Sequence, residues 1–259
     1  MRIAKKAIRA TLEHAGYWIT DRSVLPFGVD YLWDIQRMAA MHDVKIRCAF
    51  DIGAHGGETA EEFLGAFPDA QIHSFEPHPN AYIFLQKIKS GRLHAHRLAM
   101  SNKTGPADFF VYSELVEGGG AVNVLPSQNN SLVAQRQFGL VTGQYTKTIK
   151  VECQTVDQFC ADRGILALDL LKIDTEGHES EVLDGARETL TRRSVRFVFA
   201  EFETVLPVAG TTGGALAPVA ERLEPLGFRL IASYPVNMVH APFYAAFNAL
   251  YFAPTISSL

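Results

Sequence analysis

The chain has 259 residues, of which 47% are hydrophobic and 20% charged, and this composition fits one globular α/β domain rather than a disordered or collagen-like protein. Its formal net charge is −4 and it contains no dense Lys/Arg cluster, which argues against a nucleic-acid partner. The three cysteines include no C-x-x-C pair, so they predict reduced thiols in the cytoplasm rather than a disulfide framework or a zinc site.

The first 45 residues are predicted to form a helical or lid segment ahead of the main domain, which we place at 46–259. Residues 2–16 carry apolar side chains along one helical stripe and basic side chains elsewhere around the helix. We expect a packed or lid helix, with peripheral contact to an anionic membrane surface as the alternative. No transmembrane span is expected, because the most apolar tract, 241–254, is too short and contains prolines.

From residue 46 onward, short apolar runs alternate with helical stretches, which is typical of βαβ units and a mostly parallel sheet. The predicted strands cover residues 46–52, 70–76, 92–98, 168–174 and 195–202. The predicted helices cover residues 57–66, 79–89 and 178–191.

Residues 105–154 interrupt this alternation with a run rich in Gly, Asn, Gln and Ser between two strand-like segments, 108–113 and 148–153. We expect a hairpin-like insertion with a mobile tip. The next helix is expected to begin at Thr155, where Gln158 completes the spacing of a capping box.

The last part of the chain predicts one more helix after residue 213, to about residue 226. Two strand-like runs follow at 227–233 and 243–253, joined by a loop. Short strands connected in this way are expected to be antiparallel neighbours at the end of the sheet.

The stretch DIGAHGGET at 51–59 begins on a strand and leads through glycines into a helix, so a ligand could lie close to its backbone. A nicotinamide fingerprint would need glycine where His55 and Glu58 stand, and the chain has no G-K-[ST] of a P-loop. Asp51 would repel a pyrophosphate, but it suits a ligand with an amine or cationic centre, such as the amino-acid moiety of S-adenosylmethionine.

Glu76 ends the second predicted strand and stands 25 residues after Asp51. An acid at this place can hold both hydroxyls of a ribose. NAD and S-adenosylmethionine both need that contact, so Glu76 indicates an adenosine ligand without choosing between them.

The stretch LLKIDTEGHE at 170–179 gathers Asp174, Glu176, His178 and Glu179 at a predicted strand-to-helix turn. Asp174 or His178 could take a proton from a nucleophile, although a histidine here could also merely cap the helix. The same oxygen and imidazole donors could hold Mg²⁺ or a similar ion, but their spacing is not a specific metal motif, and we leave a metal unassigned.

An ordered set of motifs resembles the FkbM-type family of S-adenosylmethionine-dependent methyltransferases. The set consists of DIGAHGGET, FEP at 75–77, RLAMSNKTG at 97–105, TVDQF at 155–159, LLKIDTEGHESEVLDGA at 170–186 and FVFAEFE at 197–203. The resemblance covers about residues 46 to 203. It implies the class I methyltransferase (Rossmann-like) α/β fold: a seven-stranded, mostly parallel sheet with helices on both faces and one antiparallel strand near the C-terminus.

The resemblance also implies roles for individual residues. The cofactor turn would contain Asp51, Gly53, Ala54, His55 and Gly57, and Glu76 would bind the ribose. The adenine would lie near Ala99, Met100 and Ser101. The transferred methyl group would face Asp174, Glu176 and His178, and Asp174 would also border the cofactor. Family members commonly have Asn where this chain has His55, so the imidazole would replace an amide donor or reach toward the substrate.

The implied activity is O-methylation of a hydroxyl on a sugar, a glycolipid or polysaccharide precursor, or a secondary metabolite. Segment 113–147 and the N-terminal 40 residues are the predicted lids and acceptor-recognition pieces. A non-catalytic nucleotide-binding or regulatory protein on the same fold is the main alternative. An NAD-dependent oxidoreductase is a weaker one because of the glycine spacing. The sequence predicts neither the acceptor's identity nor the oligomeric state.

Overall fold

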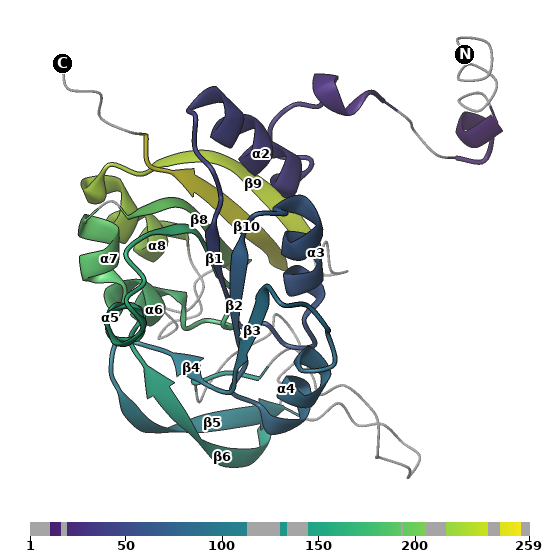
Figure 1. The fold of residues 1–259 in the computed structure, drawn as a ribbon. Helices are drawn as coiled ribbons and strands as arrows, with labels where there is room; N and C mark the ends of the chain where they lie inside the picture. The colour runs from purple at the N-terminus through teal and green to yellow at the C-terminus, as the bar shows by residue number, and fades with distance from the viewer. Residues whose placement is uncertain are drawn as a thin grey trace.

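The structure is a computed structural model of the whole chain. It describes residues 11–16, 20–112, 130–133, 145–192, 194–205, 216–237 and 244–254 (Figure 1). Within these residues, no helix has both the length and the apolar character needed to cross a membrane.

A seven-stranded sheet forms the centre of the molecule, with the strand order β3-β2-β1-β7-β8-β10-β9 (Figure 1). Its strands are β1 (Cys48–Ile52), β2 (Gln71–Phe75), β3 (Leu93–His96), β7 (Leu168–Ile173), β8 (Val195–Val205), β9 (Arg229–Asn237) and β10 (Tyr244–Phe252). β10 runs antiparallel to both of its neighbours, while the pairs from β3 to β8 are parallel. The predicted fold class, including the single antiparallel strand near the C-terminus, is confirmed.

The central strands are buried on both faces, which explains their nearly unbroken apolar sequences. All residues of β1 after Cys48 are buried, and so are all residues of β7 except Asp169. Parallel strands covered by helices on both sides have this pattern. Lys172 follows this burial pattern but departs from the apolar sequence, because it is a charged residue buried in β7.

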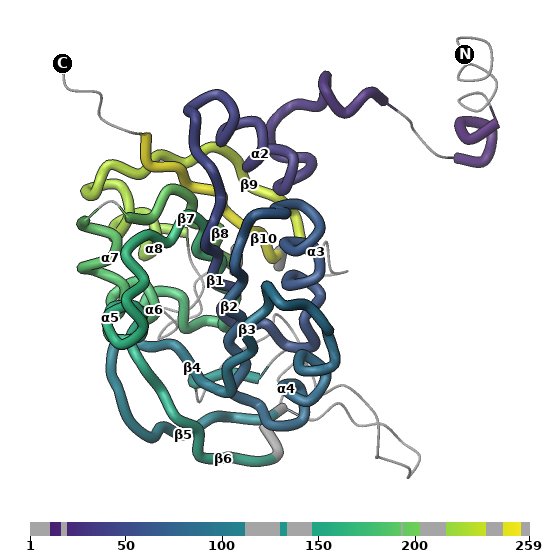
Figure 2. Tube along the Cα trace, viewed as in Figure 1, coloured from purple at the N-terminus to yellow at the C-terminus, as the bar shows by residue number. Residues whose placement is uncertain are grey.

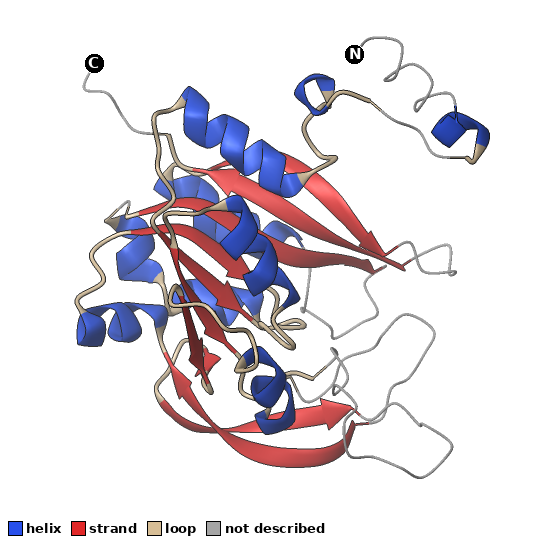
Figure 3. Ribbon diagram, turned by 45° about the vertical axis from the view of Figure 1, so that its right-hand side comes forward, coloured by secondary structure: helices blue, strands red, loops and turns tan. Residues whose placement is uncertain are grey.

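Helices cover both faces of the sheet, as Figures 1 and 3 show. On one face, α2 (Tyr31–Met41) and α3 (Glu58–Ala66) pack against the strands through Ile35 and Phe63, in a cluster with Phe197 and Leu250. The other face is covered by α5 (Val156–Arg163), α6 (Glu179–Asp184), α7 (Arg187–Thr191) and α8 (Leu216–Leu223). The remaining elements are α4 (Pro79–Leu85) beside α3 and the short 3₁₀ helices η1 (Arg22–Val24) and η2 (Glu224–Leu226).

The predicted single helix at 178–191 is wrong, because it is divided into α6 and α7 around Gly185. A Cβ atom at Gly185 would lie 2.0 Å from the carbonyl oxygen of Ser101, so only glycine fits this close approach. The carboxylate of Asp157 accepts hydrogen bonds from the backbone N–H groups of Glu188 and Thr189 at 2.9 and 2.8 Å and thereby starts a new helix.

The capping box predicted at Thr155 is half formed. The Thr155 hydroxyl accepts the N–H of Gln158 at 3.0 Å, as expected. The Gln158 side chain donates instead to Asp162, at 2.5 Å, because Asp162 lies one turn further along α5.

A second, three-stranded sheet contains β4 (Ala99–Met100), β5 (Gly105–Tyr112) and β6 (Tyr145–Gln154). β5 and β6 are antiparallel, and β4 pairs in parallel with β6. Figure 2 shows these three strands close together at the lower end of the molecule. β5 and β6 belong to the region 105–154 predicted as an insertion, whereas β4 precedes it. The predicted mobile tip lies outside the described residues apart from residues 130–133.

The N-terminal segment is described only from residue 11, and residues 11–14 are helical. Most of the helix predicted at 2–16 therefore lies outside the described residues. The boundary at residue 45, a lid role and membrane contact stay predictions. α2, however, is part of the main core, since Ile35 and Ala39 are buried against the sheet.

Candidate functional site

The candidate site lies at the carboxyl edge of the sheet, where β1, β2 and β7 end side by side. Asp51 is in register with Ser74 of β2 and with Lys172 of β7. Ligands of open parallel sheets bind at this edge. The adjacency of the three strands thus brings the motifs around Asp51, Glu76 and Asp174 together, as their sequence positions predict.

The turn after β1 needs glycine at position 53 for two reasons. Gly53 has a φ of +78°, and a Cβ atom there would lie 1.7 Å from the carbonyl oxygen of Asp174. The backbone N–H groups of Gly53 and Ala54 donate to the carbonyl of Phe75 at 3.1 and 3.0 Å. Gly57 then begins α3 with a φ of +101°. The Ala54 side chain is buried, so this residue can offer a ligand only its backbone.

His55 also has a left-handed backbone, with a φ of +47°. Asn and His are both enriched in this conformation, so the position suits the Asn common in the family as well as the histidine of this chain. The N–H of His55 donates to the Glu76 carboxylate at 2.9 Å, and its Nδ1 atom lies 3.8 Å from Glu58.

Glu76 is buried, with 6% of its surface exposed, and it is held in a fixed orientation. One carboxylate oxygen accepts the N–H of His55, and the other accepts the N–H of His78 at 2.6 Å. Burial raises the pKa of Glu76 to about 7, although these two hydrogen bonds oppose the shift. A carboxylate has more acceptor sites than these two bonds use, so ribose hydroxyls can still donate to it.

Asp51 and Lys172 form a buried ion pair. Asp51 is fully buried, and its Oδ1 lies 3.0 Å from the Nζ atom of Lys172, while its Oδ2 accepts the Ser74 hydroxyl at 3.3 Å. Burial alone lowers the pKa of Lys172, but the carboxylates of Asp51 and Asp174 raise it above its ordinary value. Sequence reasoning missed Lys172, and its signal is a single charge inside the apolar run LLKI.

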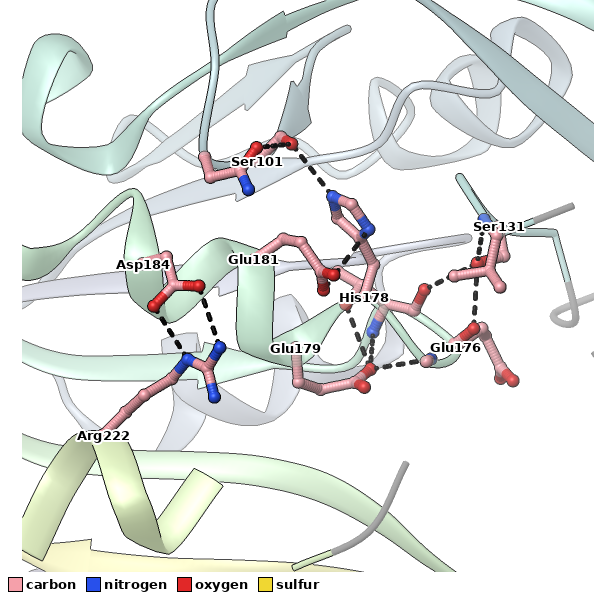
Figure 4. A network of polar contacts seen from close by, with 12 residues as sticks. Ser101, Ser131, Glu176, His178, Glu179, Glu181, Asp184 and Arg222 are labelled. Atoms are coloured by element: carbon pink, nitrogen blue, oxygen red, sulfur yellow. Dashed lines mark hydrogen bonds and ion pairs between the residues drawn. The ribbon is translucent and has the colours of Figure 1, made fainter. Parts of the chain in front are cut away.

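The turn after β7 is held by hydrogen bonds to Glu179, at the start of α6, and to Ser131, in the insertion (Figure 4). Glu179 accepts the N–H groups of Thr175 and Gly177 at 2.9 and 3.1 Å. The buried hydroxyl of Ser131, from the insertion, lies 3.2 Å from the carbonyl of Thr175 and 2.9 Å from that of Glu176. These contacts fix Glu176 at a φ of +59° and link the insertion to the site.

His178 points away from this turn toward Ser101 (Figure 4). Its Nε2 atom lies 2.9 Å from the Ser101 hydroxyl, and its Nδ1 atom lies 3.6 Å from the Glu181 carboxylate. Burial lowers the pKa of His178, while Glu181 acts in the opposite direction. Its side chain makes no capping hydrogen bond to α6, so the simple capping role is not observed.

The predicted adenine-side residues differ in what they can offer. The side chains of Ala99 and Met100 are buried in two hydrophobic clusters. The hydroxyl of Ser101 faces His178, and its N–H donates to the carbonyl of Gln154 at 3.0 Å. Contact with adenine through these residues stays a prediction.

Three carboxylates lie close together at the β7 turn and the neighbouring strand β8. Asp174, Glu176 and Glu201 of β8 each have one carboxylate oxygen within 4.8 Å of those of the other two, which among the described residues is a spacing that could hold a metal ion. The group contains Glu201 in place of the predicted His178. Glu201 was missed, and its signal is an acid near the end of the apolar strand FVFAEFE.

Comparison with known proteins adds independent findings. Residues 51–230 match the family described as Methyltransferase FkbM domain. The 2-O-methyltransferase NoeI of Sinorhizobium fredii (strain NBRC 101917 / NGR234) is 28% identical over 191 residues, which cover 71% of this chain and 73% of that protein. The 31-O-demethyl-FK506 methyltransferase FkbM of Streptomyces tacrolimicus is 28% identical over 212 residues, covering 74% of this chain and 77% of that protein.

Among solved structures, the magnesium protoporphyrin IX methyltransferase (ChlM) of Synechocystis PCC 6803 with bound SAH has a TM-score of 0.43 at 10% identity. The likeness covers 96% of this chain and 99% of that one.

The family match spans more than half of the chain and contains the β1 turn, Glu76 and the β7 turn. The resemblance inferred from the motifs is thus confirmed, and with it the S-adenosylmethionine-dependent methyltransferase function. The chain belongs to the FkbM family of methyltransferases.

Proposed function

We propose that this methyltransferase methylates a hydroxyl group on a sugar, on a glycolipid or polysaccharide precursor, or on a secondary metabolite. The names of both relatives describe O-methylation, at a 2-O and at a 31-O position. The carboxylates at the β7 turn support the same chemistry, because they can accept protons and hydrogen bonds from hydroxyl groups.

The observation that carries the cofactor part of this proposal is the orientation of Glu76 beside the glycine turn. A ribose diol needs a fixed acceptor at the end of β2, and Glu76 is fixed there by two backbone N–H groups. In the neighbouring turn, the missing Cβ atoms of Gly53 and Gly57 make room for the Asp174 carbonyl and for the side chains of Leu85 and Ile88, so these two glycines set the shape of the turn beside Glu76. When bound, S-adenosylmethionine supplies an electrophilic methyl group on a sulfonium.

Asp174 is the better candidate for the base that takes the proton from the acceptor hydroxyl. Its side chain is 33% exposed, and the Nζ atom of Lys172 lies 3.5 Å from one of its oxygens. Both ring nitrogens of His178, in contrast, already face Ser101 and Glu181. We therefore assign proton transfer to Asp174 and the orientation of the loop after β4 to His178.

A thermal shift measurement with S-adenosylmethionine, S-adenosylhomocysteine (SAH) and NADH tests the cofactor site. A ligand at about 100 times its Kd stabilises the native state by about 2.7 kcal/mol. We expect a rise in Tm with the first two ligands and not with NADH, and we expect Glu76→Ala to abolish it. A rise only with NADH would favour the oxidoreductase, and no rise with any ligand would contradict the proposal.

Methyl transfer from S-adenosylmethionine to a panel of sugars, glycolipid precursors and hydroxylated metabolites then separates an enzyme from a non-catalytic binder. Cofactor binding without transfer to any acceptor class would favour the regulatory alternative.

In a second form of the proposal, methyl transfer also requires a divalent metal held by Asp174, Glu176 and Glu201, because carboxylate oxygens are the ligands that Mg²⁺ prefers. Removal of metal with a chelator decides this form. Transfer that continues unchanged after chelation would exclude it, and recovery on adding Mg²⁺ would support it.

A further inference from the structure

Lys172 lies at the junction of the two turns that form the site. Its side chain is 5% exposed, and its Nζ atom is 3.0 Å from Asp51, 3.1 Å from the carbonyl oxygen of Gly53 and 3.5 Å from Asp174. Asp51 and Gly53 belong to β1 and its turn, whereas Asp174 follows β7. A single ammonium group therefore connects the cofactor turn with the proposed base.

Asp51 is not placed to meet the cationic end of a cofactor. It is fully buried, and its two oxygens face Lys172 and the Ser74 hydroxyl. Its negative charge is already balanced within the protein by Lys172, whereas the sequence predicts that a cationic ligand would balance it.

We propose that Lys172 is a positioning residue for cofactor binding, and that it replaces the cofactor as the cationic partner of Asp51. The proposal rests on the function proposed above. In this arrangement the ion pair acts as one unit, which holds the Gly53 carbonyl and aligns the turn on which the cofactor lies. Asp51 affects the cofactor only through Lys172.

A role in stability alone would not explain this arrangement. Two buried charges lose their hydration, and neutral residues of similar volume often replace a buried ion pair without loss of stability. Removal of one partner, however, leaves the other charge buried and unbalanced. Stability and cofactor affinity can therefore be separated by changing both residues together.

The test compares Lys172→Met, Asp51→Asn and the double variant by calorimetric titration with SAH and by thermal unfolding. We expect each single variant to bind SAH at least about tenfold more weakly than the wild type, which corresponds to about 1.4 kcal/mol. The double variant should bind no more weakly than the weaker single variant, because the pair acts as a unit. Its Tm should return toward that of the wild type while its SAH affinity remains low.

The pair Lys150–Asp108 provides a matched control, since its atoms are 2.8 Å apart but both side chains are exposed. Lys150→Met with Asp108→Asn should leave SAH affinity unchanged, because exposed ion pairs contribute little. If Lys172→Met does not fold, the double variant alone still separates stability from binding.

Two results would overturn the proposal for Lys172 while leaving the proposed function intact. A double variant that binds SAH like the wild type would make the pair purely structural. A loss of SAH binding free energy in the double variant equal to the sum of the losses in the two single variants would mean that Asp51 contacts the cofactor independently of Lys172. If the wild type itself fails to bind SAH, the proposed function is contradicted, and the role of Lys172 falls with it.

Discussion

The proposed cofactor and acceptor sides of the site differ in how their charged groups are held. On the cofactor side, Asp51, Glu76 and Lys172 are buried, and each has short contacts to groups on neighbouring strands or turns. On the acceptor side, Asp174 and Glu176 are only partly buried and lie on a turn. The proposed cofactor side is therefore held by contacts among the strand ends, whereas the proposed acceptor side is also held by Ser131 of the insertion.

This difference matches what each side must do. A cofactor common to a whole family can be bound by a rigid, preorganised set of groups, which lose little freedom on binding. An acceptor that varies among enzymes is better served by adaptable segments, and Ser131 shows that the insertion reaches the β7 turn. Variants on the two sides should accordingly separate cofactor affinity from methyl transfer.

The largest effect is expected from Asp174→Asn. Loss of the proposed base should lower the rate of methyl transfer by about 10²- to 10⁴-fold, while SAH affinity falls far less. Steady-state transfer assays and calorimetric titration with SAH measure the two quantities. His178→Gln is the comparison variant, and a loss as large as that of Asp174→Asn would show that the base is assigned to the wrong residue.

Gly53→Ala should damage the cofactor side through the backbone. The new Cβ would overlap the Asp174 carbonyl and would force a residue with a side chain to keep a φ of +78°. We expect a loss of about 3 kcal/mol in the free energy of unfolding, measured with urea. Gly65→Ala is the control, because nothing lies within 4 Å of its Cβ position in α3 and Ala favours helix. Equal effects at both glycines would contradict the close contact at Gly53.

The cofactor side was largely predictable because its signals are local. Apolar runs place the strands around Phe50, Ile72 and Leu171, and the acids at their ends share an edge because the strands are parallel. The need for glycine at position 53 also follows from the strand-to-helix turn. The ion pair was not predictable from spacing, since the sequence of β7 does not show that Lys172 stands beside Asp51 of β1.

The missed features depend on contacts between distant parts of the chain. Gly185, where the helix breaks, lies against the backbone carbonyl of Ser101 in the loop after β4. The hydroxyl of the same serine is the partner of the His178 imidazole. Glu201 joins the acidic group only because β8 pairs with β7. A single sequence shows such residue types but not their proximity, so the acceptor side could be predicted only in part.

The pH dependence of SAH binding would sharpen the account of Glu76, whose pKa is raised to about 7 by burial. Ribose hydroxyls donate to the ionised carboxylate, so affinity should rise about tenfold between pH 6 and pH 8. Stability should change in the opposite direction. The folded state keeps this proton between the usual pKa near 4.5 and about 7, so the contribution of Glu76 to stability is lost as pH rises through that window.

Calorimetric titration with SAH across this pH range measures the expected change in affinity. Glu76→Gln should bind weakly and without this pH dependence. An equally steep dependence in that variant would assign the titration to another group.

The smallest effect is expected from His55→Asn, which introduces the residue that the family resemblance leads us to expect at this position. Both residues are compatible with a φ of +47°, so the free energy of unfolding should change by no more than about 0.5 kcal/mol. SAH affinity should also change little, because the contact between positions 55 and 76 uses the backbone N–H. His55→Val, which places a β-branched residue in the left-handed region, should cost about 1–2 kcal/mol. If His55→Asn instead abolishes methyl transfer while SAH still binds, the imidazole itself reaches the acceptor, and the boundary between the two sides moves to include the β1 turn.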